Sequence, residues 1–299
     1  MPSHNNPLLS RVGIGLIVAA LFFGTAILGG WWWSSLVFCS ILLSNRELRK
    51  LLMVQGIRPS RTLVYSTAVC MVIFTTLDKP HFLYPILTLT LMASFFLLLL
   101  RSPRATIGDI GGTLLSVVYV VFLPIHYILL RQLNRLPGAP HWAQPGLHYL
   151  MFILMVICIS DIAAYYGGLR FGRTLLYPTI SPKKTREGAL FGLAAGVGMG
   201  ALDSLFWPEI PMGHAMVLSV ILVIVGQLGD LTESMMKRDV GMKDSGELLA
   251  SHGGLLDRVD SYIFSGTVCY YYFYWIVLRQ GLAPEVLQMI RHLYAHFVR

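Results

Sequence analysis

Three aspartates lie around a polar, glycine-punctuated stretch that separates two apolar segments of the chain. Asp230 comes just before this stretch, and Asp257 and Asp260 stand three residues apart at its end. Side chains with this spacing can share one face of a helix. Mg²⁺ takes one or two carboxylates and completes its coordination with water and phosphate oxygens. These aspartates are therefore candidate Mg²⁺ ligands, although the helix macrodipole alone also favours carboxylates at a helix start.

Residue types that bind phosphate occupy the same stretch. On a helix, Ser234, Lys237 and Arg238 fall on one broad face with Asp230, where two cations and a hydroxyl could hold phosphate oxygens. The run His252-Gly253-Gly254 precedes an expected helix start, where glycine lets a phosphate approach free backbone N–H groups closely. A salt bridge between Lys237 and either Asp230 or Glu233, worth little at an exposed surface, is the plainer alternative.

A second polar cluster lies upstream. Asp161 falls within an expected membrane span, and Ser181, Lys183 and Lys184 lie in the loop that follows this span. We expect Asp161 to be buried and therefore to need a cation or a strong hydrogen-bond partner. The two lysines and the hydroxyl could bind a polyanionic substrate. The same basic loop could also serve only to anchor the chain on one side of a membrane.

The composition is that of a membrane protein. Of 299 residues, 55% are hydrophobic and only 13% are charged, and the mean hydropathy is +0.65. A soluble domain carries about 25% charged residues. The net charge of +8 is explained by cytoplasmic loops that meet anionic lipid headgroups, so we expect no nucleic-acid partner.

Apolar runs close to the length of a membrane span recur along the whole chain. We expect an all-α, polytopic integral membrane helical bundle with about nine transmembrane helices. The expected spans are 12–29, 31–45, 62–77, 82–100, 106–130, 146–168, 188–207, 214–233 and 258–278. Residues 1–145 would form N-terminal transmembrane helices, and residues 146–299 a catalytic region with cytoplasmic loops 169–187 and 234–257. Gly192, Gly196 and Gly200, spaced four apart on one span, are typical of a close helix–helix contact.

Lysine and arginine are distributed unevenly between the two sets of loops. With a cytoplasmic N-terminus, most of them fall in cytoplasmic segments, including both polar loops. The positive-inside rule therefore predicts an external C-terminus and a candidate site on the cytoplasmic side.

Together, the two clusters resemble the signature of phosphatidate cytidylyltransferases, also called CDP-diacylglycerol synthases. The resemblance covers about residues 161–260, whereas the first 150 residues match only as generic spans. The downstream block that carries it comprises Ser234, Lys237, Arg238, Lys243, Asp244, Ser251, His252, Gly253, Gly254, Asp257, Arg258, Val259 and Asp260. The upstream block comprises Asp161, Ala164, Tyr165, Ser181, Pro182, Lys183, Lys184, Thr185, Glu187 and Gly188.

The resemblance implies an enzyme of phospholipid biosynthesis that makes CDP-diacylglycerol and pyrophosphate from CTP and phosphatidate. It implies an all-helical membrane bundle, a homodimer, and a polar cavity that faces the cytoplasm, as in a bacterial inner membrane. The cavity would hold Mg²⁺, with a second cation as an option.

The resemblance also implies roles for individual residues. The metal ligands would be Asp230, Asp257 and Asp260. The catalytic residues would be Lys237, Arg238, His252, Asp257 and Asp260. The residues that bind substrate would be Asp161, Ser181, Lys183, Lys184, Ser234, Lys243, Gly253, Gly254 and Arg258. No general base is required, because phosphatidate is already ionised near neutral pH.

Three alternatives stay open. A transporter or ion channel could use Asp161 and Asp230 as a cation path, but a pore has no need of a Lys-Arg pair and a His-Gly-Gly run. A CDP-archaeol synthase or a polyprenol kinase would use CTP with a different lipid. An inactive scaffold would keep the fold alone, and the intact acidic set argues against it.

Overall fold

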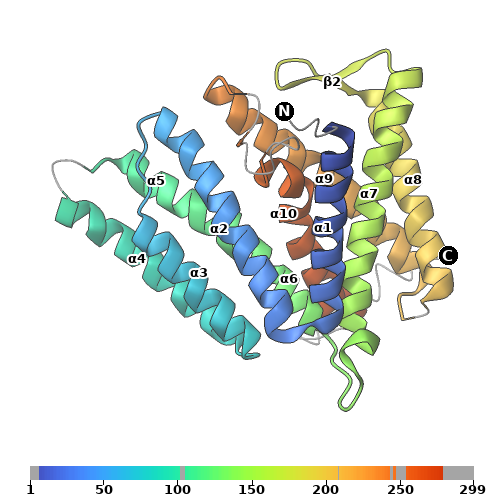
Figure 1. The fold of residues 1–299 in the computed structure, drawn as a ribbon, viewed down its shortest axis with the longest axis horizontal. Helices are drawn as coiled ribbons and strands as arrows, with labels where there is room; N and C mark the ends of the chain where they lie inside the picture. Colours follow the sequence, from blue (N-terminus) through green and yellow to red (C-terminus); the bar gives the residue numbers. More distant parts are fainter. Residues whose placement is uncertain (1–6, 102–104, 208, 243–244, 247–253, 279–299) are drawn as a thin grey trace, which may run out of the picture.

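The computed structural model describes residues 7–101, 105–207, 209–242, 245–246 and 254–278. Helices dominate this part of the chain and pack side by side in one bundle (Figure 1). The α-helices are α1 (Pro7–Leu28), α2 (Gly30–Val54), α3 (Arg61–Thr76), α4 (Leu83–Arg101), α5 (Ile107–Leu115), α6 (Leu123–Gln132), α7 (Pro145–Phe171), α8 (Arg186–Phe206), α9 (Met212–Asp239) and α10 (Leu256–Tyr271). Short 3-10 helices at Pro80–Phe82 and His141–Ala143 precede α4 and α7, and π-helical stretches at Ser116–Phe122 and Tyr272–Val277 join α5 to α6 and continue α10.

Within the described residues, five helical segments are long and apolar enough to cross a membrane. They are Pro80–Leu97, Ile107–Gln132, Pro145–Phe171, Arg186–Phe206 and Met212–Asp239. Every span expected from the sequence overlaps a helical stretch, but α1, α2, α3 and α10 are not among these five. The prediction of a helical membrane protein is therefore confirmed, and the count of about nine spans is not.

Short-range capping fixes where several helices begin. Thr106 and Asp109 form a capping box at α5, in which each side chain accepts a backbone N–H of the other residue. Thr185 Oγ1 accepts the N–H of Gly188 at 3.1 Å and so caps the start of α8. Between α1 and α2 the chain reverses at Gly29, whose φ of 64° suits a residue without a Cβ.

The helices that carry the candidate residues pack closely because glycines line one face of α8. Gly192, Gly196 and Gly200 are all buried. A Cβ added at Gly192 would lie 2.9 Å from the carbonyl oxygen of Ser160 on α7. The close helix–helix contact predicted from the spacing of these glycines is confirmed, and it sets α7 and α8 side by side.

One two-stranded sheet adds to the predicted helical fold. The loop between α7 and α8 forms an antiparallel hairpin of β1 (Leu175–Tyr177) and β2 (Ser181–Thr185), with Leu175 opposite Thr185 and Tyr177 opposite Ser181. Glu187, in the first turn of α8, accepts the N–H groups of Arg173 and Thr174 at 3.1 Å each. The predicted basic turn is therefore a strand attached to the start of α8.

The hairpin, the ends of α2 and α9 and the start of α10 lie at the same end of the bundle (Figure 1). Gln55, which follows α2, donates a hydrogen bond to Asp239 at the end of α9. Arg238 Nε donates to the carbonyl of Ile180 in the hairpin turn at 3.3 Å. This end of the molecule therefore brings the hairpin together with the described part of the second predicted polar loop, 234–257.

Candidate active site

One lysine of the hairpin, Lys184, lies against Asp230 of α9. Because side chains alternate along a strand, Lys183 and Lys184 point to opposite faces of β2. Lys184 forms an ion pair with Asp230, and both side chains are about two-thirds buried, with exposures of 31% and 30%. Lys183 is exposed. Ser234 Oγ, one turn further along α9, lies 3.4 Å from Asp230 Oδ1.

Asp260 comes close to Asp230 because α9 and α10 touch at a glycine. A Cβ added at Gly229 would lie 2.6 Å from the carbonyl oxygen of Asp260, so the two backbones meet beside both carboxylates. Asp260 is buried, with an exposure of 8%, and accepts the N–H of Ser261 at 2.6 Å. The charges of Asp230 and Asp260 repel one another, and such a pair favours a nearby cation.

Asp161 joins the same electrostatic cluster from α7. Its carboxylate interacts with the charges of both Asp230 and Lys184. The side chain lies at the protein surface and not in the core, but the surrounding atoms still desolvate its carboxylate, as expected for an aspartate within a span. Among the described residues, the carboxylates of Asp161, Asp230 and Asp260 all interact with the ammonium of Lys184, and Asp260 also interacts with that of Lys237. This excess of negative charge suits binding of a cation.

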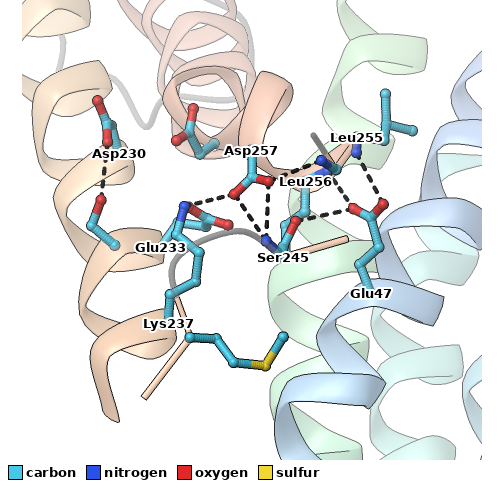
Figure 2. A network of polar contacts seen from close by, with 12 residues as sticks. Glu47, Asp230, Glu233, Lys237, Ser245, Leu255, Leu256 and Asp257 are labelled. Carbon is cyan, nitrogen blue, oxygen red and sulfur yellow. Dashed lines mark hydrogen bonds and ion pairs between the residues drawn. The ribbon is translucent and has the colours of Figure 1, made fainter. Parts of the chain in front are cut away.

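Asp257 belongs to a different set of contacts (Figure 2). Its Oδ1 lies 2.6 Å from Lys237 Nζ, and Lys237 also forms an ion pair with the fully buried Glu233. Asp257 Oδ2 accepts the N–H groups of Ser245 at 3.1 Å and Gly254 at 3.0 Å. Burial raises the pKa of Asp257, but the hydrogen bond and charge of Lys237 outweigh it and hold the pKa below its usual value.

The three aspartates proposed as metal ligands are consequently not one ligand set. Among the residues that the structure describes, no three His, Cys, Asp or Glu side chains are arranged to hold a metal ion. The physical reason is that Asp257 is turned towards Lys237 and the backbone before α10, while Asp260 faces Asp230. Asp230 and Asp260 together still fit Mg²⁺, because this ion needs only one or two protein carboxylates.

The described backbone N–H groups at the start of α10 are already hydrogen-bonded within the protein. Glu47, from α2, accepts the N–H groups of Leu255 at 3.1 Å and Leu256 at 2.7 Å. Asp257 takes the N–H of Gly254. All three of these backbone donors are thus bound by carboxylates of the protein, and of the predicted run His252-Gly253-Gly254 the described N–H of Gly254 is not available to a ligand. The predicted site residues Lys243, His252 and Gly253 lie outside the described residues.

The remaining basic residues sit at the rim of the site. Arg238 is exposed, and besides the carbonyl of Ile180 it binds that of Met242 at 3.1 Å. Arg238 therefore joins α9 to the hairpin turn. Arg258 is exposed on α10, and Ser181 is half-buried at the start of β2.

The sequence is similar to those of known proteins over most of its length. Residues 9–276 match the sequence profile described as the cytidylyltransferase family. The chain belongs to this family. A phosphatidate cytidylyltransferase of Synechocystis is 38% identical over 283 residues, which cover 88% of this chain and 95% of the relative.

Two further similar proteins are also described as phosphatidate cytidylyltransferases. The chloroplastic phosphatidate cytidylyltransferase 5 of Arabidopsis thaliana is 36% identical over 285 residues, covering 87% of this chain and 70% of the relative. The phosphatidate cytidylyltransferase of Staphylococcus haemolyticus is 31% identical over 260 residues, covering 85% of this chain and 94% of the relative. The match spans both the N-terminal helices and the signature, so it extends well beyond the resemblance seen in the sequence.

Sequence reasoning missed Glu47 in this cytidylyltransferase family member. Its side chain is fully buried, with an exposure of 0%. One signal was present: it is the single acidic residue in the basic run Arg46-Glu47-Leu48-Arg49-Lys50. That run was assigned to a loop after a span, whereas α2 continues through it to Val54.

Proposed function

We propose that the chain transfers the cytidylyl group of CTP to phosphatidate, producing CDP-diacylglycerol and pyrophosphate. The observation that carries this proposal is the convergence of Lys184, Asp230 and Asp260 at one end of an apolar bundle, in a member of the cytidylyltransferase family. An apolar bundle suits a lipid substrate, and an acidic pair with an adjacent lysine suits a site for phosphates and a cation. The relatives described as phosphatidate cytidylyltransferases support the same reaction.

Bond changes in this reaction balance without a general base. A phosphate oxygen of phosphatidate attacks the α-phosphorus of CTP, the bond from that phosphorus to the bridging oxygen breaks, and pyrophosphate leaves with the bonding electrons. The protein's task is to align two anions that repel one another and to offset the charge on the transferred group.

The chain's residues divide this task between them. Lys184 lies at the carboxylate of Asp230, so its ammonium is within reach of phosphates bound there. Lys183, Arg238 and Arg258 supply further positive charge at the rim, with Ser181 and Ser234 as hydroxyl donors. We assign Lys237, near the end of α9, to the phosphates of CTP. Asp230 and Asp260 would hold Mg²⁺, which when bound offsets phosphate charge.

Asp257 receives a revised role in this proposal. It keeps Lys237 oriented and ties the backbone of Ser245 and Gly254 to the start of α10. Truncation of Asp257 would therefore disturb the site through the position of Lys237.

We further propose that the site faces the cytoplasm and that the enzyme is a homodimer. The concentration of Lys and Arg in the loops at this end supports the sidedness. The family resemblance supports the dimer. Labelling of a cysteine placed at exposed Lys183, in a variant without the natural cysteines, tests the first point. Cross-linking of the purified protein in lipid tests the second.

The decisive experiment measures pyrophosphate release and incorporation of labelled CTP into chloroform-extractable lipid. We expect both to require phosphatidate and a divalent cation. Asp260→Asn should lower kcat by about 100-fold, because it removes one of the two carboxylates that would hold the Mg²⁺ needed to offset phosphate charge. Asp239→Asn is the matched control, since Asp239 lies at the end of α9 and contacts Gln55 instead of the cluster.

Two outcomes would overturn the proposal. Labelled CTP that never enters lipid would exclude the reaction and favour a transporter. Faster turnover with an isoprenoid alcohol or an archaeal ether lipid than with phosphatidate would reassign the lipid substrate.

A further inference from the structure

The buried carboxylate of Glu47 connects α2 to the segment that precedes α10, whose described residues are Ser245, Gly246, Gly254 and Leu255. Glu47 Oε1 and Oε2 accept the N–H groups of Leu255 and Leu256, and Oε2 also accepts the hydroxyl of Ser245 at 3.3 Å. Figure 2 shows the carboxylate facing these donors at the helix start. The N-terminus of a helix favours a negative charge, so Glu47 occupies the position where a bound anion would otherwise sit.

Two glycines leave the room that this carboxylate needs. A Cβ added at Gly246 would lie 2.7 Å from Glu47 Oε1, and one at Gly254 would lie 2.8 Å from Oε2. Both distances are shorter than a real Cβ contact allows. Any larger residue at these positions would displace the carboxylate or the segment itself.

The contacts of Glu47 continue to the lysine assigned to CTP. Ser245 is fully buried and joins two carboxylates: its hydroxyl binds Glu47, and its N–H binds Asp257. Asp257 in turn binds Lys237 Nζ. The series Glu47, Ser245, Asp257, Lys237 therefore runs without a break from α2 to α9.

We propose that Glu47 is a positioning residue for the transfer reaction, which fixes the segment before α10 and, through Ser245 and Asp257, the ammonium of Lys237. This inference rests on the proposed function for its kinetic consequence but not for its structural one. Glu47 touches neither substrate, because the backbone donors and Ser245 surround its carboxylate.

The first test compares Glu47→Gln with Gln55→Ala in the full-length protein. Glutamine keeps the shape but turns an NH2 group towards backbone N–H donors, so the segment loses an acceptor. We expect kcat/KM for CTP to fall about 10- to 100-fold in Glu47→Gln, because small displacements of positioned groups cost this much. The KM for phosphatidate should stay within about twofold of the wild type. Gln55→Ala removes another contact between α2 and α9 and should leave both substrates unaffected.

The second test uses a compensating pair. Gly246→Ala should impair CTP use in the presence of Glu47, because its Cβ meets the carboxylate. In a Glu47→Ala background the same change should cost nothing more, since the carboxylate that it meets is gone. Equal effects of Gly246→Ala in both backgrounds would overturn the direct contact.

A third readout is independent of the reaction. Hydrogen exchange at the amides of Leu255 and Leu256 should accelerate at least tenfold in Glu47→Gln and stay unchanged in Gln55→Ala, because these N–H groups donate to Glu47 and not to Gln55. Unchanged exchange would refute the inference even if the reaction is correct. If exchange accelerates in Glu47→Gln but the wild-type protein does not turn over CTP, the structural role of Glu47 stands and the proposed function is refuted. Equal losses for CTP and phosphatidate, in proportion to folded protein, would reduce Glu47 to a purely stabilising role and overturn the proposal.

Discussion

Replacing Lys184 by methionine tests the most direct consequence of the hairpin. Lys184 pairs with Asp230, whereas the neighbouring Lys183 is exposed on the opposite face of the strand. Lys184→Met therefore removes an ammonium that interacts with the carboxylates of Asp161, Asp230 and Asp260. Lys183→Met removes a solvated charge beside the site and serves as the comparison.

The contacts of each lysine set the expected size of its effect. A hydrogen bond to a charged group is worth about 1.5–3 kcal/mol, and each 1.4 kcal/mol is about a factor of ten. Lys184 is 31% exposed, so solvent screens part of its charge, and the lower end of this range applies. We expect kcat/KM to fall about 10- to 30-fold in Lys184→Met. For Lys183→Met we expect about fivefold at most, because exposed charges contribute about 0–1 kcal/mol.

The assay is substrate-dependent pyrophosphate release at varied CTP and varied phosphatidate, with melting temperatures recorded to confirm that both variants fold. If Lys183→Met loses as much activity as Lys184→Met, the difference between the two faces of β2 does not explain the role of Lys184. A wild-type rate in Lys184→Met would show that the ion pair with Asp230 has no part in the reaction.

Two further predictions concern stability. Gly192→Ala should destabilise the bundle by about 1–3 kcal/mol, because its Cβ meets the backbone of α7; Gly198→Ala on the same helix meets nothing within 4 Å and should be neutral in the same thermal unfolding assay. The second prediction follows from the lowered pKa of Asp257: the ionised carboxylate stabilises the folded state above pH 3.8, its usual pKa, and this contribution is lost as the pH falls through the lower folded value. The difference in melting temperature between the wild type and Asp257→Asn should therefore shrink below about pH 4, and a difference that widens there would contradict this assignment.

The helices could be predicted because their signals are local. Apolar runs of span length mark α4 to α9, and the spacing of Gly192, Gly196 and Gly200 indicated which face of α8 packs closely. The hairpin gave weaker signals. Its strands have three and five residues, and Pro182 lies inside β2, where proline argues against a strand.

The site was predicted in its residue types but not in its pairings. Asp230, Asp260 and Lys184 do converge, since polar residues at the end of apolar helices collect where water can reach them. The partner of Asp257 could not be deduced, because spacing alone does not say which way a carboxylate in a first turn points. The contacts of Glu47 could not be predicted for a different reason: its backbone partners lie 208 and 209 residues away in the sequence.

The contact of α2 with the start of α10 limits how far this protein can be treated as modular. A fragment that begins at Pro145 would contain every residue of the signature, yet the first turn of α10 would lack the acceptor for Leu255 and Leu256. Chimaeras between relatives should therefore exchange α2 together with the segment between α9 and α10. Splitting the gene within 133–140, the turn before α7, should give halves that regain activity only when they are expressed together.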